Sequence, residues 1–236
     1  MQITNLFKKF LFSFFSILFI STSAQALSLQ KTSVILDAPW GMTWLDDKYL
    51  LITQKSGEIF MVDTQDYSQT SIKHNIPSVQ YGQGGMLDII SDEKNIWVTC
   101  SIEKKGKHTT AIYRAELSGD KLINEKMIYE ALPYIKSPYH FGSRLELKGD
   151  HLFASIGERG EGMIAQDPTN SIGTIIRIHK NGDIPDDNPY VDNPNWLPEI
   201  YQIGVRNPQG MILDPYHKIF SFPIMVLRGE ISLALF

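Results

Sequence analysis

Short, mostly apolar segments, separated by polar turns, run along most of the chain. The segments 49–53 and 58–62 flank the turn 55–57, and the segment 174–178 leads to an Asn-Gly pair at 181–182. Short apolar runs bounded by turn residues are typical of β-strands, and Asn-Gly favours a tight hairpin turn. After the apolar N-terminal run, no stretch of 12 or more residues has the pattern of a capped amphipathic helix. The pattern predicts an all-β protein.

One unit recurs four times along the chain. Each copy consists of a glycine, a short apolar strand, a polar turn and a second apolar strand, and the copies start at Gly41, Gly85, Gly142 and Gly210. The starts lie 44, 57 and 68 residues apart. Repeats of about 40–50 residues with four short strands are typical of β-propeller blades, some of which are lengthened by insertions. A β-sandwich is the alternative, but it gives no reason for one hairpin to recur with the same glycine start.

The N-terminal region predicts a secretory signal peptide over residues 1–26. Two lysines precede an apolar run at 10–20, and an Ala-x-Ala sequence ends at Ala26, which is the order of a signal peptide and its cleavage site. An uncleaved anchor is the alternative, but the run is shorter than the roughly 20 residues that a spanning helix needs. We expect a mature domain over 27–236, without a membrane span, in the periplasm or secreted.

Composition and charge exclude several classes of protein. The net charge of −4 gives no indication of a basic nucleic-acid-binding surface. Cys100 is the single cysteine, which excludes a disulfide framework and any multi-thiolate metal site. Because Cys100 lies in the alternating segment 96–102, we expect it to be a small buried side chain rather than a catalytic thiol.

Polar residues with useful chemistry stand just before the repeat glycines. Gln83 and His140 each lie two positions before a repeat glycine, while Arg206 and Asn207 precede the last one by four and three positions. The first strand of each propeller blade lines the central channel, so these side chains should meet around one axis. The alternative is that they are turn residues that only hydrogen-bond the loops.

Seven ordered segments resemble the soluble sugar dehydrogenases that use pyrroloquinoline quinone (PQQ), the glucose/sorbosone or aldose sugar dehydrogenases. The strongest is Gly-Val-Arg-Asn-Pro-Gln-Gly at 204–210, and the resemblance extends from about residue 30 to 215. The resemblance implies a six-bladed β-propeller. The other matching segments are 39–42, 82–88, 140–145, 157–160, 165–168 and 182–190.

The resemblance also implies a reaction and roles for the residues. The protein would oxidise an aldose at its anomeric carbon by transferring a hydride to PQQ, with His140 as general base and Arg206 stabilising the negative charge that develops on the quinone. Gln83, Arg206 and Asn207 would bind and orient the cofactor. Calcium would accompany PQQ, and a cytochrome or respiratory quinone would accept the electrons.

The sequence departs from the family pattern at two places. Val205 stands where many relatives carry histidine. From about residue 220 the chain is apolar and turnless, where the resemblance implies an acidic, His- and Gly-rich segment and two further blades. We therefore expect that only three to four blades are encoded, through a disrupted reading frame or because this is a fragment. The calcium ligands would belong to the missing part, and the activity of this chain stays open.

Other polar residues allow weaker interpretations. The group formed by Asp183, Asp186, Asp187 and Asn188 lacks the spacing of a calcium loop and is interpreted as a turn-rich connection. His151 is interpreted as a strand residue exposed to solvent.

Glu158 and Arg159 follow an inner strand and could edge a substrate pocket. Two other functions remain open. A calcium-dependent sugar lactonase would need metal-facing carboxylates at several blade starts, which instead carry Gln83, His140 and Arg206. A non-enzymatic, extracytoplasmic carbohydrate-binding propeller is the other alternative.

Overall fold

The computed structural model describes residues 31–213, 220–225 and 231–235. The chain divides into two compact units, Met1–Ser33 and Val34–Phe236, and the description below concerns the second. The predicted signal peptide lies outside the described residues. Among the residues described, no helix has the length and apolar character needed to cross a membrane.

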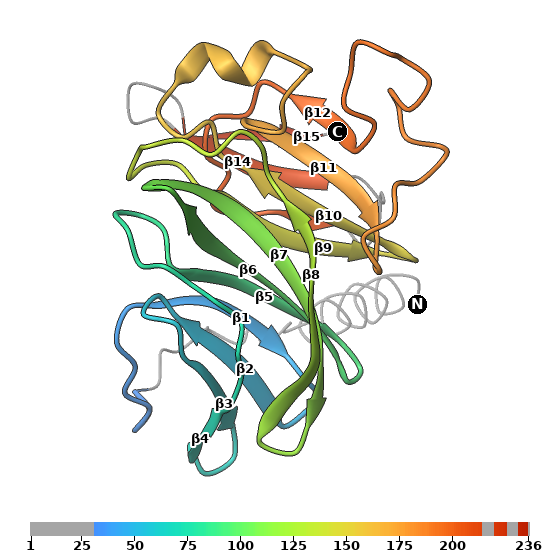
Figure 1. Cartoon of the computed structure of the whole chain (residues 1–236). Helices are drawn as coiled ribbons and strands as arrows, with labels where there is room; N and C mark the ends of the chain where they lie inside the picture. The colour runs from blue at the N-terminus through green and yellow to red at the C-terminus, as the bar shows by residue number, and fades with distance from the viewer. Residues whose placement is uncertain (1–30, 214–219, 226–230, 236) are drawn as a thin grey trace, which may run out of the picture. The chain divides into compact units, whose positions relative to one another are not determined.

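The second unit consists of β-strands in four antiparallel sheets (Figure 1). Within the described part of the chain, a short 3-10 helix, η1 (Gly162–Gln166), is the one helical element. The prediction of an all-β protein is confirmed. The strands are β1 (Pro39–Trp44), β2 (Tyr49–Gln54), β3 (Ile59–Asp63) and β4 (Gln69–Ile72); β5 (Met86–Asp92), β6 (Asn95–Lys104), β7 (Lys107–Ser118) and β8 (Lys121–Glu130); β9 (Gly142–Lys148), β10 (His151–Ile156), β11 (Thr174–His179) and β12 (Ile200–Ile203); and β13 (Ile212–Leu213), β14 (Phe220–Met225) and β15 (Ile231–Leu235).

Each sheet is a meander in which consecutive strands pair, so the first strand of each lies at one edge. These first strands contact one another from sheet to sheet, β1 with β5, β5 with β9 and β9 with β13. Successive meanders joined along their first strands are the blades of a β-propeller, which confirms the predicted architecture. The described strands form three four-stranded blades and a three-stranded fourth sheet.

The hydrophobic core lies between neighbouring blades. One cluster, which includes Leu51, Ile59, Met86 and Val98, joins strands of the first and second blades. A second cluster, which includes Trp97, joins the second and third blades. A strand between two such clusters is buried on both faces, and β6 is accordingly buried along most of its length.

A hydroxyl side chain on the second strand of each complete blade bonds the first strand of its own blade. These hydroxyls belong to Thr53, Thr99 and Ser155, and each stands opposite a break in the regular pairing register. A register break leaves a backbone N–H without its ladder partner. The hydroxyl accepts that N–H, from Gly41 at 2.9 Å, from Asp88 at 2.8 Å and from Arg144 at 3.0 Å.

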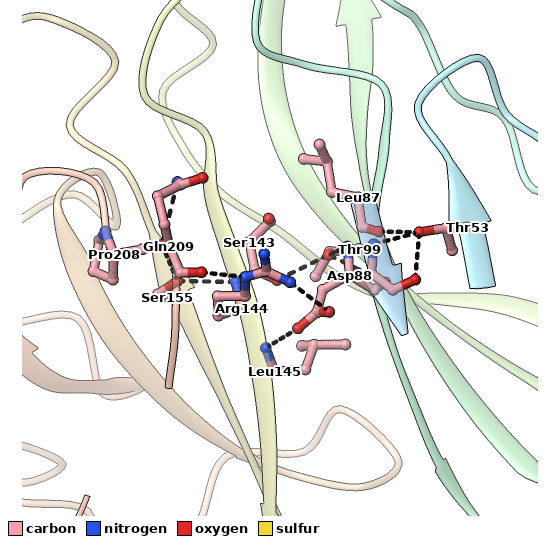
Figure 2. Close-up of polar contacts among 11 residues, drawn as sticks. Thr53, Leu87, Asp88, Thr99, Ser143, Arg144, Leu145, Ser155, Pro208 and Gln209 are labelled. Carbon is pink, nitrogen blue, oxygen red and sulfur yellow. Dashed lines mark hydrogen bonds and ion pairs between the residues drawn. The ribbon is translucent and has the colours of Figure 1, made fainter. Parts of the chain in front are cut away.

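The same three hydroxyls reach the next blade, as Figure 2 shows. Each lies within hydrogen-bond distance of a backbone carbonyl there. Thr53 donates to the carbonyl of Leu87, Thr99 to that of Ser143 at 2.9 Å, and Ser155 to that of Pro208 at 3.5 Å. We call this repeated contact the hydroxyl bridge. It satisfies buried backbone groups on two blades at once, so it joins neighbouring blades edge to edge.

An ion pair reinforces the junction between the second and third blades (Figure 2). Nη1 of Arg144 in β9 lies 3.0 Å from Oδ1 of Asp88 in β5, and the N–H of Leu145 donates to Oδ2 of Asp88 at 2.9 Å. Nε of Arg144 donates to the carbonyl of Gln209 at 2.6 Å, which extends the contact toward the fourth sheet. Burial raises the pKa of Asp88, and Arg144 opposes that shift.

Removing one hydroxyl bridge should weaken the fold. Thr99→Val keeps the shape of the side chain but leaves the Asp88 N–H and the Ser143 carbonyl unpaired. Because a buried unsatisfied group costs about 1–3 kcal/mol, we expect the free energy of unfolding to fall by about 2–4 kcal/mol. Urea unfolding followed by tryptophan fluorescence measures this change. Thr70→Val, on an exposed position of β4, is the control and should change stability by less than about 0.5 kcal/mol.

Cys100 is fully buried, as predicted, and burial raises the pKa of its thiol to about 12. The thiolate is the reactive form, so the native protein should react with Ellman's reagent at pH 8 far more slowly than the urea-unfolded protein. Both rates are read from absorbance. Stoichiometric labelling of the native protein within the time needed by the unfolded protein would contradict this assignment.

Candidate active site

Four loops, all close to the ends of inner or second strands, supply the candidate site. They are the segments before β5, β9 and β13 and the segment 157–162 after β10. Because blades repeat, segments far apart in the sequence end at the same side of the sheets. Backbone hydrogen bonds join the loops directly, from Gln83 N–H to the Pro138 carbonyl at 2.7 Å and from Glu158 N–H to the Arg206 carbonyl at 2.8 Å.

The carboxylate of Glu158 is the centre of the site. Its side chain is 2% exposed, and Oε1 contacts Nδ1 of His140 and lies 3.6 Å from Nη1 of Arg206. Oε2 accepts the N–H of Gly162 at 2.6 Å. One buried carboxylate therefore brings together the predicted base and the predicted cation, which are 66 residues apart in the sequence.

The contact with Glu158 determines which nitrogen of His140 can act as a base. A carboxylate accepts hydrogen bonds, so Nδ1 carries a proton, and in the neutral imidazole Nε2 is then the nitrogen with the free lone pair. The His140 side chain is 14% exposed. Its backbone has a φ of 53°, in the left-handed region, which is uncommon for a residue with a side chain.

A close backbone approach fixes the position of His140. A Cβ atom at Gly157 would lie 2.1 Å from the carbonyl oxygen of His140, so a larger residue would push the two loops apart. This packing explains why a glycine precedes Glu158.

Gln83 supports the loop that carries His140. Its Oε1 accepts the backbone N–H of His140 at 2.7 Å, while the side chain as a whole is exposed. Lys55, at the turn between β2 and β3, donates from Nζ to the carbonyl of Gly82. Gln83 therefore lies next to the predicted base, and its cofactor contact stays a prediction.

Asn207 and Arg206 differ in exposure. Asn207 is 5% exposed, and its Oδ1 accepts the N–H of Gly142 at 3.1 Å and Nε2 of Gln209 at 2.9 Å. Arg206 is 33% exposed. Its guanidinium pairs with Glu158, which is its one ion-pair partner among the residues that the structure describes. A guanidinium carries five N–H donors, so this one ion pair does not use them all.

The structure revises the interpretation of Glu158 and Arg159. Glu158 was expected at the edge of a pocket, but it lies between His140 and Arg206. Arg159 is fully buried, so it does not line an open pocket. Its position directly after Gly157-Glu158 is the one sequence signal for its role, and the contacts that it makes are visible only in three dimensions.

The remaining polar residues lie apart from this cluster. The His151 ring stacks on His179 with centroids 5.0 Å apart, and Asp187 pairs with Arg177 at 2.6 Å. Asn188 donates to the carbonyls of Arg177 and Pro198. In the described ranges, no group of three or more His, Cys, Asp or Glu side chains is arranged to hold a metal ion.

The fold and these loops define a β-propeller with a histidine, a carboxylate and an arginine gathered where its inner strands begin. A family model described as Glucose / Sorbosone dehydrogenase matches residues 36–222. The chain belongs to this family.

Similar proteins agree with this assignment. The chain is 33% identical over 192 residues to the aldose sugar dehydrogenase YliI of Escherichia coli K12. The aligned region covers 77% of this chain and 52% of that protein. The chain thus spans about half the length of the curated relatives it matches.

Two solved structures share the fold. The apo form of the soluble aldose sugar dehydrogenase from Escherichia coli has a TM-score of 0.80 at 30% identity, over 85% of this chain and 60% of that one. The PQQ-bound form of the aldose sugar dehydrogenase from Streptomyces coelicolor has a TM-score of 0.75 at 22% identity, over 89% and 63%.

Removing the central carboxylate should weaken the site measurably. Glu158→Ala leaves the Gly162 N–H, His140 Nδ1 and Arg206 without their shared partner. We expect the free energy of unfolding to fall by about 2 kcal/mol, because the Gly162 N–H and Nδ1 each lose a bond to a buried carboxylate while Arg206 is partly solvated. Urea unfolding measures the effect. Glu161→Ala, at an exposed neighbouring position, is the control; equal stability of the two variants would show that Glu158 does not hold the loops together.

Proposed function

We propose that this protein oxidises an aldose sugar at its anomeric carbon, with PQQ as the hydride acceptor. The observation that carries the proposal is the single buried carboxylate that holds His140 beside Arg206. Membership of the glucose/sorbosone dehydrogenase family supports a sugar substrate and an oxidoreductase reaction.

His140 is the proposed general base. With Nδ1 bonded to Glu158, Nε2 is the atom that takes the proton from the anomeric hydroxyl. The positive charge that then develops on the ring faces the carboxylate of Glu158, as in other histidine–carboxylate pairs. Glu158 also fixes the ring orientation, so that the base does not need to reorient during the reaction.

The residues present fit a quinone cofactor. Arg206 keeps guanidinium donors that Glu158 does not use, and a cation beside quinone oxygens suits the negative charge that they acquire. The amides of Gln83 and Asn207, on adjoining loops, would orient the same group. When bound, PQQ accepts the hydride from the sugar carbon. A PQQ-bound neighbour of the same fold supports this choice of cofactor.

The wider setting follows from the sequence. We propose that residues 1–26 direct the protein out of the cytoplasm and that calcium accompanies PQQ. A cytochrome or a respiratory quinone is the proposed electron acceptor, since both are accessible to an extracytoplasmic dehydrogenase.

An assay with two variants tests the proposal. The full chain without residues 1–26 is supplied with calcium and PQQ, and dye reduction is followed with a panel of aldoses. His140→Gln removes the basic Nε2 and should lower kcat roughly 100- to 10,000-fold, the range of general base catalysis. Cofactor binding, measured separately by absorbance titration, should persist because His140 is assigned to the sugar.

His179→Gln is the matched control, since His179 lies in β11 with its ring stacked on His151. It should keep the wild-type rate. Dye reduction that is equal in wild type and His140→Gln would remove His140 from the reaction. A wild-type chain that binds no PQQ would contradict the proposed cofactor.

A further inference from the structure

Five consecutive backbone carbonyls, those of residues 137–141, are all hydrogen-bonded in the loop that carries His140. Three donors come from Arg159, one from Gln83 and one from Thr110. The pairs are Ser137 with Arg159 Nη2, Pro138 with Gln83 N–H, Tyr139 with Arg159 Nε, His140 with Arg159 N–H and Phe141 with Thr110 Oγ1.

Arg159 is the largest contributor to this arrangement. Its side chain is fully buried, Nε donates to the Tyr139 carbonyl at 2.9 Å, and Nη1 donates to the His108 carbonyl in β7 at 2.7 Å. Its backbone N–H donates to the His140 carbonyl at 3.2 Å. The guanidinium therefore ties the loop of the predicted base to the third strand of the preceding blade.

An aromatic ring packs on the guanidinium. Cζ of Arg159 lies 3.5 Å from the centroid of the Phe141 ring, and the neighbouring His108 ring stacks on Tyr81 with centroids 4.1 Å apart. Tyr81 in turn begins the loop that presents Gln83. The buried cluster thus lies between the two loops that carry Gln83 and His140.

The chemistry of arginine suits this task better than that of lysine. Burial lowers the pKa of Arg159 to about 10, which still leaves the side chain charged at neutral pH. The flat guanidinium directs several N–H groups at fixed angles, so it can bond carbonyls of three different residues at once. An ammonium group is a point charge on a flexible chain and cannot reproduce that geometry.

We propose that Arg159 is a positioning residue, which clamps residues 137–140 so that His140 keeps its left-handed backbone and its ring stays on Glu158. The catalytic consequence rests on the proposed function. Arg159 reaches the backbone of the loop and not the imidazole, so its effect on the reaction passes through the placement of His140.

Hydrogen exchange tests the clamp without any assay of activity. Arg159→Met fills the same space without donors, and Arg159→Lys keeps a charge without the fixed donor geometry. We expect backbone amides of the segment 139–142 to exchange at least about 10-fold faster in Arg159→Met and by an intermediate factor in Arg159→Lys. The strand β6 should keep its wild-type protection in both variants.

Kinetics with PQQ, calcium and an aldose provide the second readout. Because small displacements of a catalytic group can cost about 100-fold in rate, we expect kcat of Arg159→Met to fall roughly 100-fold. KM should change by less than about threefold, since Arg159 does not touch the sugar site. Arg114→Met is the matched control. Arg114 lies in β7 and donates to Oδ1 of Asn95 in β6 at 2.8 Å, so both residues belong to the second blade, and the loss of this bond should leave kcat unchanged.

Each outcome decides the proposal. Unchanged exchange at 139–142 would overturn it, and so would loss of protection throughout β6 in both variants, because Arg159 would then support the whole fold rather than the loop. An unchanged kcat in an Arg159→Met variant with a loosened loop would remove the catalytic consequence. If wild type oxidises no aldose, the proposed function fails, while the exchange result still decides whether Arg159 clamps the loop.

Discussion

The structure depends on how the first strands of neighbouring blades satisfy their backbone groups. These strands break register with their own blade, which leaves N–H groups and carbonyls that a buried location cannot tolerate without partners. The hydroxyls of Thr53, Thr99 and Ser155 satisfy both sides of each junction. Once the junctions are fixed, the loops that precede the inner strands have no freedom to separate, and their side chains meet.

The site extends the same principle from hydroxyls to charges. Glu158 joins His140 to Arg206 in much the same way that a hydroxyl bridge joins two strands, with one group serving two neighbours. Arg159, the next residue, bonds carbonyls on the other side of the loop. Two successive residues therefore orient His140: Glu158 contacts its ring, and Arg159 bonds the backbone of its loop. This division of work accounts for a histidine that is partly exposed and yet tightly placed.

Much of the architecture was predictable from the sequence, because blades repeat and repetition is visible in one dimension. The glycine starts located the inner strands, and the polar residues before them placed Gln83, His140, Arg206 and Asn207 on adjoining loops. The partnership of Glu158 with His140 was not predictable, since it depends on how two loops cross. The hydroxyl bridges were missed for a similar reason. A threonine in a strand is ordinary in sequence, and its bond to the next blade appears only when the blades are packed.

Asn207 has one structural contact and one proposed binding role, and together they limit the substitutions that position 207 can accept. Its Oδ1 holds the N–H of Gly142, the first residue of the neighbouring inner strand, while its proposed role is to contact a bound cofactor. Asn207 therefore cannot be replaced freely when the protein adapts to a different ligand. A side chain without the Oδ1 atom would leave the buried N–H of Gly142 unpaired. The side chains of Gln83 and Arg206 are more exposed than that of Asn207, although Gln83 also accepts the N–H of His140 and Arg206 pairs with Glu158. The hydrogen bond to Gly142 therefore limits which residues can replace Asn207 when the ligand specificity of the protein changes during evolution.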